Sequence, residues 1–247
     1  MALTRTAVLA EADRFQICLA TSAAEMRALQ RLRYQIFAEE LGADIVDAEG
    51  LERDPFDRHC QHLYVFDRDR DQLVGGTRLL NRAGAAKAGG FYSQGEFLMD
   101  AVLQLDGELL EVGRTCIHPD YRDGSGIALL WQGLAAVFRQ QQTRYLFGCA
   151  SVPMRDSSAH VHALLQRLER YRLPASLAVT AVNPIPAAAA LTNIDTPVPA
   201  LLKAYLRLGA KIGAHACWDE QFGCADLFVL LQVSELDARY ARHFGVR

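Results

Sequence analysis

The chain has 247 residues, of which 51% are hydrophobic and 22% are charged, and its formal net charge is −3. This length and balance predict a globular protein with one full hydrophobic core, treated as a single domain over residues 1–247. The weak negative charge and the lack of a basic tail argue against nucleic acid as a partner. No stretch has the pattern of a signal peptide or a membrane span, so we expect a cytoplasmic protein, with peripheral contact to the inner membrane left open.

Strands and helices are expected to alternate around one mixed central sheet, which is typical of the α/β or α+β class. Strands are expected over residues 15–20, 63–66, 73–80, 109–117, 145–150 and 225–233. Helices are expected over residues 127–141, 157–171 and 199–208, and from a capping box at Ser22 to Gly42. Residues 83–95 are expected to form a glycine-rich loop, and residues 174–199 an irregular arm rich in proline and alanine.

The six cysteines are scattered without a Cys-x-x-Cys pair, so we interpret them as small buried hydrophobes in a reducing compartment. Asp57, His59, Cys60 and His62 lie close together in the sequence. Their spacing matches no standard zinc pattern, and His62 leads directly into an expected strand. We therefore expect no metal site there.

Four charged residues fall in segments that are otherwise apolar. Arg33 shares a helix face with Leu29 and Phe37, and Arg78 interrupts an apolar strand. Glu111 and Arg114 lie within another strand, over residues 109–117. A buried charge costs several kcal/mol unless another group pairs with it. These four residues are therefore candidates for a functional site, although Arg33 could instead extend its charged end to solvent.

Gly113 lies between Glu111 and Arg114 and affects how this strand is read. In a regular strand the odd spacing would put the two charges on opposite faces. A bulge at Gly113 would bring both to one face and would free a backbone N–H for a ligand. The alternative is a structural buried ion pair between Glu111 and Arg114.

Acidic residues crowd the loop from Gly42 to Arg58, and Asp54 and Asp57 stand closest to its apolar anchor. Such a run is usually a solvated surface. Beside arginines in a core, however, these acids suit a small ligand that carries both an anionic and a cationic end. A free amino acid fits that description.

The pattern of these residues resembles a known family, the bacterial acyl-homoserine lactone synthases, which have the GCN5-related N-acetyltransferase (GNAT) fold. The matching motifs are, in order, Arg33-x-x-x-Phe37, Asp54-x-x-Asp57, Arg78-Leu-Leu and Glu111-x-x-Arg114. One motif departs from that family: Ala43 follows Leu-Gly where those synthases have a tryptophan of their S-adenosylmethionine site.

Nearly the whole chain is similar to the L-ornithine N-alpha-acyltransferases, the haemolysin-like proteins that start ornithine lipid synthesis. The similar segments are residues 59–63, 89–92, 113–122, 128–131, 147–150 and 205–211. The resemblance implies transfer of a 3-hydroxyacyl group from acyl carrier protein to the alpha-amino group of L-ornithine, which gives lyso-ornithine lipid. The alternatives are an N-acyl amino acid or acyl-homoserine-lactone-type synthase with another acceptor, and a non-catalytic protein that binds carrier protein or membrane.

The resemblance also implies roles for the charged residues. Glu111 would be the general base, held charged and oriented by Arg114. The amino-acid carboxylate or the acyl 3-hydroxyl would bind to Arg33 and Arg78, beside Phe37. The side-chain ammonium of ornithine would be received by Asp54 and Asp57. Fold analogy alone assigns Tyr205 to protonation of the leaving thiolate, and the favoured alternative is a tyrosine of the hydrophobic core.

A Gly-x-Gly turn before the helix over residues 127–141 resembles the phosphate-binding loop of acetyltransferases. Its expected phosphopantetheine-binding residues are Arg122, Gly124, Ser125 and Gly126. The arginine stands one place late in this motif, which favours phosphopantetheine on a carrier protein as co-substrate over free coenzyme A. No cofactor is expected to be bound permanently. Six arginines between residues 139 and 172 are a candidate docking face for the acidic acyl carrier protein, with a solvated helix surface as the alternative.

Overall fold

The computed structural model describes residues 7–154, 158–188 and 196–236. Its centre is an eight-stranded sheet with the strand order β1-β2-β3-β4-β6-β7-β10-β9. The strands are β1 (Ala7–Ala12), β2 (Phe15–Leu19), β3 (Gln61–Asp67), β4 (Gln72–Asn81), β6 (Glu108–Ile117), β7 (Thr143–Pro153), β9 (Lys211–Asp219) and β10 (Cys224–Gln232). Strands β6 and β7 run parallel, and the other neighbours in this sheet run antiparallel. The expected mixed sheet is confirmed.

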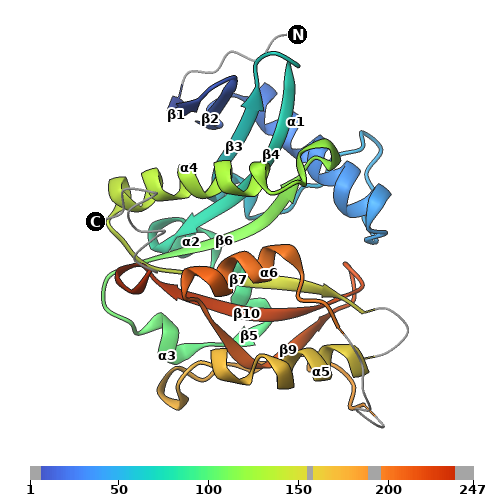
Figure 1. Cartoon of the computed structure of the whole chain (residues 1–247), viewed down its shortest axis with the longest axis vertical. Coiled ribbons are helices and arrows are strands. Elements are labelled where there is room, and N and C mark those ends of the chain that lie inside the picture. Colours follow the sequence, from blue (N-terminus) through green and yellow to red (C-terminus); the bar gives the residue numbers. More distant parts are fainter. Residues whose placement is uncertain (1–6, 155–157, 189–195, 237–247) are drawn as a thin grey trace.

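Helices cover both faces of the sheet (Figure 1). They are α1 (Ala23–Tyr34), α2 (Arg82–Ala88), α3 (Asp100–Leu103), α4 (Ser125–Gln141), α5 (Ala159–Arg167) and α6 (Ala200–Leu208). The predicted capping box is present at Ser22 and Glu25, and α1 continues as a π-helical segment, Gln35–Glu40. Alternate residues of β2 face different helices: Ile17 packs in the same cluster as α4, whereas Cys18 packs in the same cluster as Leu29 of α1.

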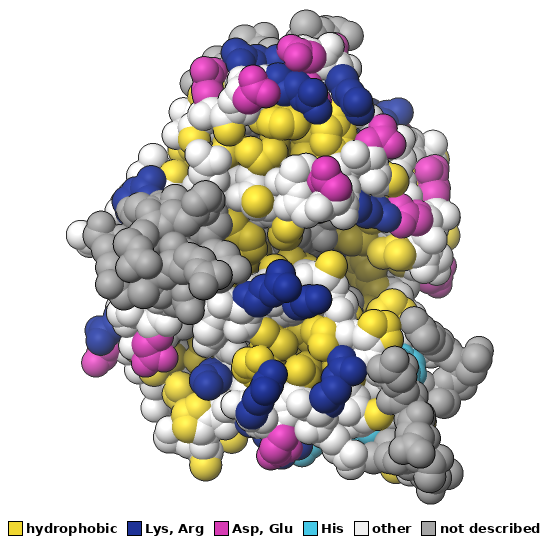
Figure 2. Space-filling view, viewed as in Figure 1, with side chains coloured by type: hydrophobic (Ala, Val, Ile, Leu, Met, Phe, Trp, Pro, Cys, Tyr) yellow, Lys and Arg dark blue, Asp and Glu magenta, His cyan; other side chains and the backbone are white. Residues whose placement is uncertain are grey.

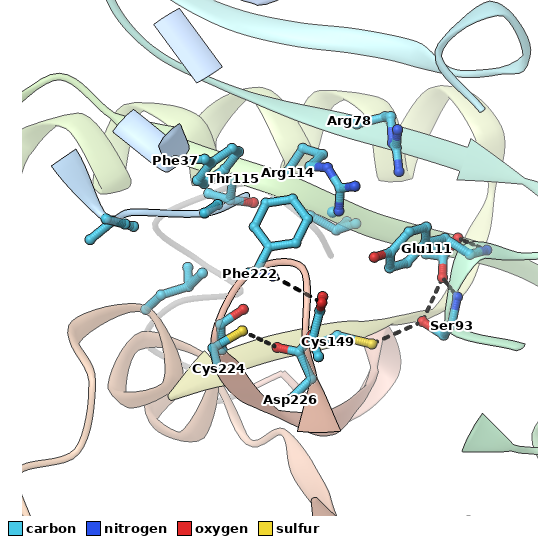
Figure 3. Close-up of a pocket in the computed structure, with 18 of the residues that line it drawn as sticks. Phe37, Arg78, Ser93, Glu111, Arg114, Thr115, Cys149, Phe222, Cys224 and Asp226 are labelled. Atoms are coloured by element: carbon cyan, nitrogen blue, oxygen red, sulfur yellow. Dashed lines mark hydrogen bonds between the residues drawn. The ribbon is translucent and has the colours of Figure 1, made fainter. Parts of the chain in front are cut away.

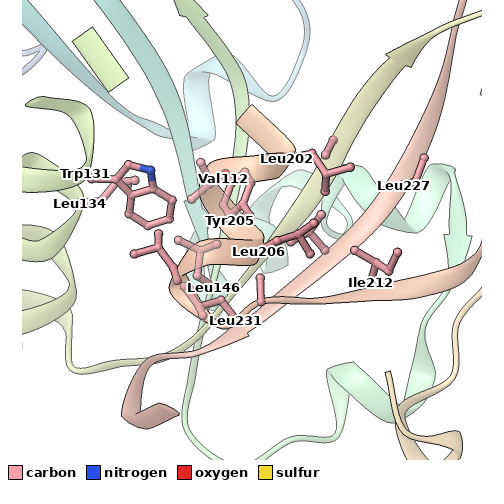
Figure 4. Packing of buried hydrophobic residues seen from close by; sticks show 14 of the residues in the cluster. Val112, Trp131, Leu134, Leu146, Leu202, Tyr205, Leu206, Ile212, Leu227 and Leu231 are labelled. Carbon is pink, nitrogen blue, oxygen red and sulfur yellow. The ribbon is translucent and has the colours of Figure 1, made fainter. Parts of the chain in front are cut away.

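The main core joins the two halves of the sheet (Figure 4). Trp131 of α4 meets Tyr205 of α6 edge to face, with 5.3 Å between ring centroids. Val112 of β6 and Leu146 of β7 are buried in the same cluster. Since truncating a buried tryptophan typically costs about 3–5 kcal/mol, this contact contributes much of what fixes α4 relative to α6.

The sheet opens at its one parallel pairing, between β6 and β7. The pairing runs from Glu108 opposite Thr143 to Glu111 opposite Phe147. Beyond that point β6 continues along β4, while β7 continues along β10. At the fork a Cβ on Gly148 would lie 2.2 Å from the carbonyl oxygen of Val112, so this close approach requires glycine. The two strands therefore diverge directly after Glu111.

Two regions differ from the sequence-based expectations. The expected glycine-rich loop over residues 83–95 contains α2, because Asn81 caps the alanine-rich segment and accepts a hydrogen bond from Gly84 N. The expected irregular arm contributes a short strand, β8 (Thr180–Ala181), which pairs with β5 (Phe97–Leu98). Residues 189–195 of this arm lie outside the described residues. Among the described helices, none is both long enough and apolar enough to cross a bilayer.

Candidate functional site

A cavity of about 300 Å³ lies where β6 and β7 diverge (Figure 3). Its walls come from β6, β7, β10, α6 and the segment after α1. Phe37 and Phe222 lie on one side, in edge-to-face contact at 5.7 Å, and Glu111 and Ser93 lie on the other. The volume is at the lower end of the range found for small-molecule sites. An apolar side and a charged side thus meet in one space.

A bulge in β6 shapes the upper wall of this cavity. Gly113 pairs with Arg78 and Cys116 pairs with Gly76, so Arg114 and Thr115 together lie opposite the single residue Thr77. Arg114 adopts a left-handed backbone with φ of +50°.

The Thr77 hydroxyl donates to the Gly113 carbonyl over 3.2 Å and lies 2.7 Å from the Thr115 hydroxyl, which fixes the bulge. The predicted bulge is therefore present one residue later than expected. As predicted, it brings Glu111 and Arg114 to the same cavity.

Glu111 is 5% exposed and is held by a short 3₁₀ helix, Tyr92–Gly95. Its carboxylate accepts hydrogen bonds from Tyr92 N (2.9 Å), Ser93 N (2.6 Å) and Ser93 Oγ (2.5 Å). Burial raises the pKa of Glu111 above its ordinary value, although the hydrogen bonds from Ser93 and Tyr92 and the charge of Arg78 oppose the shift. A carboxyl with a raised pKa is better matched to accepting a proton near neutral pH.

Arg114 does not orient Glu111, and this expectation was wrong. Its guanidinium donates to Glu52 over 2.9 Å and to Asp54 over 3.2 Å. It also lies over the rings of Tyr92, at 4.7 Å, and Phe222, at 4.6 Å. Arg114 therefore forms part of the cavity wall and fixes the two aromatic rings.

Arg33 is 3% exposed and belongs to a layer behind the cavity. It binds Asp57 through two hydrogen bonds of 3.0 and 2.8 Å, and it also pairs with Glu52. Burial favours the neutral form of Asp57, but the hydrogen bonds and charge of Arg33 hold the pKa of Asp57 well below its usual range. Arg33 was expected to contact the substrate, but it does not line the cavity; its donors hold the acidic loop against α1, and substrate contact stays a prediction.

Arg78 connects this layer to the cavity. It lines the cavity and donates to Asp54 over 2.6 Å and to Asp57 over 3.1 Å. Neither aspartate lines the cavity, and both already bind arginines, so the structure does not support the expectation that Asp54 and Asp57 receive an ammonium group. One charge-balanced network therefore joins three arginines to three acids. Its members are Arg33, Arg78, Arg114, Glu52, Asp54 and Asp57.

Sequence reasoning missed several residues of the lower wall, among them Cys149, Asp219 and Asp226. Asp226 is 4% exposed within the apolar strand β10, so the same search for buried charges would have found it. Burial, with the nearby acids Glu96 and Asp226, raises the pKa of Cys149 well above its ordinary value. Burial likewise raises the pKa of Tyr205, which lines the cavity from α6. Both side chains therefore stay protonated at neutral pH.

The candidate phosphate loop lies at the N-terminus of α4, outside the cavity lining. Gly124, with φ of +105°, precedes the helix. Asp123 accepts hydrogen bonds from Ser125 N (2.9 Å) and Ser125 Oγ (2.7 Å). Arg122 is held by Glu40 at 2.8 Å and by the carbonyl of Ile117 at 2.9 Å. The four predicted residues, which include Gly126, are thus together at a helix N-terminus, with Arg122 engaged by an acid.

Comparison with known proteins identifies relatives of this chain. Residues 32–132 match the acetyltransferase (GNAT) domain family. The chain is 35% identical to the L-ornithine N(alpha)-acyltransferase of Brucella abortus (strain 2308), over 96% of this chain and 91% of that protein. It is 34% identical to the L-ornithine N(alpha)-acyltransferase of Rhizobium meliloti (strain 1021), over 96% and 86%.

Two solved structures share the fold at low sequence identity. FeeM, an N-acyl amino acid synthase from uncultured soil microbes, superposes with a TM-score of 0.52 at 12% identity, covering 90% of this chain and 92% of that chain. The acyl-homoserine lactone synthase LasI superposes with a TM-score of 0.51 at 13% identity, covering 88% of each chain. The GNAT-like fold expected from the sequence is confirmed.

Proposed function

Because the chain belongs to the family of the L-ornithine N(alpha)-acyltransferases, we propose that it transfers a 3-hydroxyacyl group from acyl carrier protein to the alpha-amino group of L-ornithine. The product would be lyso-ornithine lipid. The observation that carries this proposal is the buried Glu111 carboxylate, with its raised pKa, in a cavity that has both a charged and an apolar side. Such a cavity suits an amino acid and an acyl chain together.

Glu111 acts as the general base, directly or through a water molecule. The alpha-amino group of ornithine is mostly an ammonium ion at neutral pH, and it must lose a proton before it can attack a thioester. That proton passes to Glu111, and the freed nitrogen lone pair forms a bond to the thioester carbon. Arg78 and Arg114 line the same cavity and offer charged donors to the ornithine carboxylate.

The oxyanion that develops during attack is bound at the bulge in β6. Gly113 lines the cavity, and a Cβ at this position would meet no atom within 4 Å, so a substrate can approach the backbone closely there. The bulge takes backbone N–H groups of β6 out of the regular pairing with β4, and in this proposal one of them stabilises the negative charge on the thioester oxygen. Thr77 holds the bulge from the neighbouring strand.

Transfer is direct, without an acyl-enzyme intermediate. Cys149 lines the cavity, but a thiol whose pKa is raised well above its ordinary value is a poor nucleophile. When the tetrahedral intermediate collapses, the carbon–sulfur bond breaks and the phosphopantetheine thiolate leaves. The newly bonded nitrogen must lose a second proton to become the amide. Tyr205 lines the cavity and relays this proton: it donates its own proton to the leaving sulfur and regains one from the nitrogen, because burial raises its pKa and disfavours the phenolate.

The carrier protein docks beside α6. One side of this helix lines the cavity with Leu201 and Tyr205, and the other exposes Lys203 and Arg207. Figure 2 shows Lys and Arg side chains gathered over the half of the molecule that contains α6. An acidic carrier protein is attracted to such a surface, which lies within reach of the cavity for its phosphopantetheine arm.

The six arginines between residues 139 and 172, which were expected to form a docking face, are not all equally available for docking. Arg172 pairs with Glu169 over 2.7 Å, and Arg155 lies outside the described residues. The loop from Arg122 to Gly126 remains the proposed contact for the phosphate of the phosphopantetheine arm.

A competition assay tests the function. The purified protein is mixed with 3-hydroxyacyl carrier protein, equimolar amino acids and S-adenosylmethionine, and the products are weighed by mass spectrometry. The expected product has the mass of 3-hydroxyacyl-ornithine. A product with the mass of another acyl amino acid would show that ornithine is not the acceptor. No acylated product, with carrier protein still bound, would contradict an enzymatic function.

A further inference from the structure

Three buried or half-buried acids, two that line the cavity and one just behind its wall, have no cationic partner among the described residues. They are Glu96, Asp219 and Asp226, and none of them forms an ion pair there. The two arginines that line the cavity, Arg78 and Arg114, are already bound to the balanced network. Charged carboxyl groups that are buried without a partner are costly, and a cation that entered this group would offset that cost.

Glu96 is the strongest sign that a ligand completes the group. It is 8% exposed, and neither carboxylate oxygen receives a hydrogen bond of good geometry; the polar side chains beside it are Cys149 and Asp226. Burial and then the charge of Asp226 raise the pKa of Glu96 to about 8. A carboxyl group in this state can give up its proton when a cation arrives beside it.

The cluster is connected to the proposed base through a short series of contacts. Glu96 directly follows the 3₁₀ helix whose first amides bind Glu111. Ser93 in that helix lies 2.5 Å from Glu111 and 3.4 Å from Cys149 Sγ. Figure 3 shows Cys149 beside Asp226 on the floor of the cavity. Ser93 and Cys149 therefore lie between these acids and Glu111.

We propose that Glu96, Asp219 and Asp226 bind the side-chain ammonium of the ornithine acceptor while its alpha-amino group faces Glu111. This inference rests on the proposed function and deepens it, because it identifies the part of the site that selects a diamino acid. An extended ornithine separates its two nitrogens by roughly 6 Å, from bond lengths of about 1.5 Å. The ammonium supplies three N–H donors to carboxylates that can only accept once Glu96 has given up its proton.

The test compares ornithine with norvaline, which has the same carbon chain but no terminal amine. We expect Glu96→Gln and Asp226→Asn to lower kcat/KM for ornithine by about 10- to 100-fold, mainly through KM, and to leave kcat/KM for norvaline unchanged or higher. The matched control is Glu220→Gln, an exposed acid next to Asp219, which should keep the wild-type preference. An unchanged ratio of ornithine to norvaline in both cluster variants would overturn the inference.

A binding measurement judges the inference separately from the reaction. Ornithine should raise the melting temperature of the wild-type protein, whereas norvaline should not, and Glu96→Gln should abolish the ornithine effect. Equal shifts with both ligands, or a shift retained in Glu96→Gln, would overturn the ammonium site even if acyl-ornithine is formed. A wild-type protein that binds ornithine selectively but never acylates it would instead overturn the proposed function alone.

A metal ion is the competing occupant. Ligand atoms of Asp219, Cys224 and Asp226 lie within 4.8 Å of one another. Treatment with EDTA should leave activity on ornithine unchanged, which supports the ammonium site. Loss of activity with EDTA and its recovery on adding Zn²⁺ would show that the cluster holds a metal, contrary to the inference.

Discussion

The hydroxyl of Ser93 donates to a carboxylate oxygen of Glu111 over 2.5 Å, and both residues are buried. A base at this position should dominate the chemical step. We expect Glu111→Gln to lower turnover by about 10²- to 10⁴-fold while the fold is retained, because glutamine has the same size but takes up no proton. Steady-state kinetics and circular dichroism measure the two effects. Activity close to that of the wild type would remove Glu111 from the base role.

Ser93→Ala should change the pH profile more than the fold. The hydrogen bond stabilises the charged form of Glu111, so its loss raises the pKa of Glu111 further. Because the base works only when deprotonated, the acidic limb of the kcat profile should move to higher pH. A profile of kcat against pH that does not move would mean that another group limits the acidic side.

Arg33→Lys should destabilise the protein strongly. Lysine keeps the positive charge but cannot form the bidentate contact to Asp57, so buried carboxylate oxygens lose hydrogen bonds, at a cost of about 1–3 kcal/mol in the free energy of unfolding. The matched control is Arg27→Lys, whose exposed pair with Glu49 should contribute less than about 1 kcal/mol. Urea unfolding measures both. Wild-type stability with a raised KM for ornithine would return Arg33 to the substrate site.

Arg122 should become more available when Glu40 is neutralised. Glu40 binds Arg122 and so competes with a phosphate for it. We expect Glu40→Gln to lower the KM for acyl carrier protein and Arg122→Gln to raise it, each by a few fold, while the KM for ornithine stays constant. If both variants had the same KM for acyl carrier protein as the wild type, Arg122 would be excluded from phosphate binding.

Glu96→Gln should stabilise the free protein even though it weakens ornithine binding. The folded-state pKa of Glu96, about 8, lies above the ordinary carboxyl value, so this group lowers stability as pH rises from about 4.5 towards 8. At pH 7 the variant should gain on the order of 3 kcal/mol in unfolding free energy, and at pH 4 it should match the wild type. Loss of stability at pH 7 would show that Glu96 has a structural partner.

The fold could be predicted where the hydrophobic periodicity was clear and where capping or turn residues marked the ends of elements. The capping box at Ser22 and the alternation of strands and helices identified most of the elements that the structure contains. β9 was not predicted, because Lys211–Asp219 mixes glycine, alanine and histidine and has no clear strand pattern. Its pairing with β10 stabilises it as a strand in the folded protein.

The site could be predicted in its members better than in its contacts. Buried charges marked Arg78, Glu111 and Arg114, but no spacing rule pairs Arg114 with Glu52, 62 residues away in the chain. Glu96 stands before a strand of only two residues, so no pattern marked it as buried. The partners of a charge are set by tertiary packing, which local sequence does not encode.

Tandem mass spectrometry of the product made from ornithine tests the central claim most directly, because it locates the acyl group on one of two amines. With Glu111 facing one amine and the acids at Glu96 holding the other, acylation should occur on the alpha nitrogen alone. Acyl groups on the side-chain nitrogen, or on both nitrogens, would contradict this orientation of the acceptor and with it the proposed arrangement of base and ammonium site.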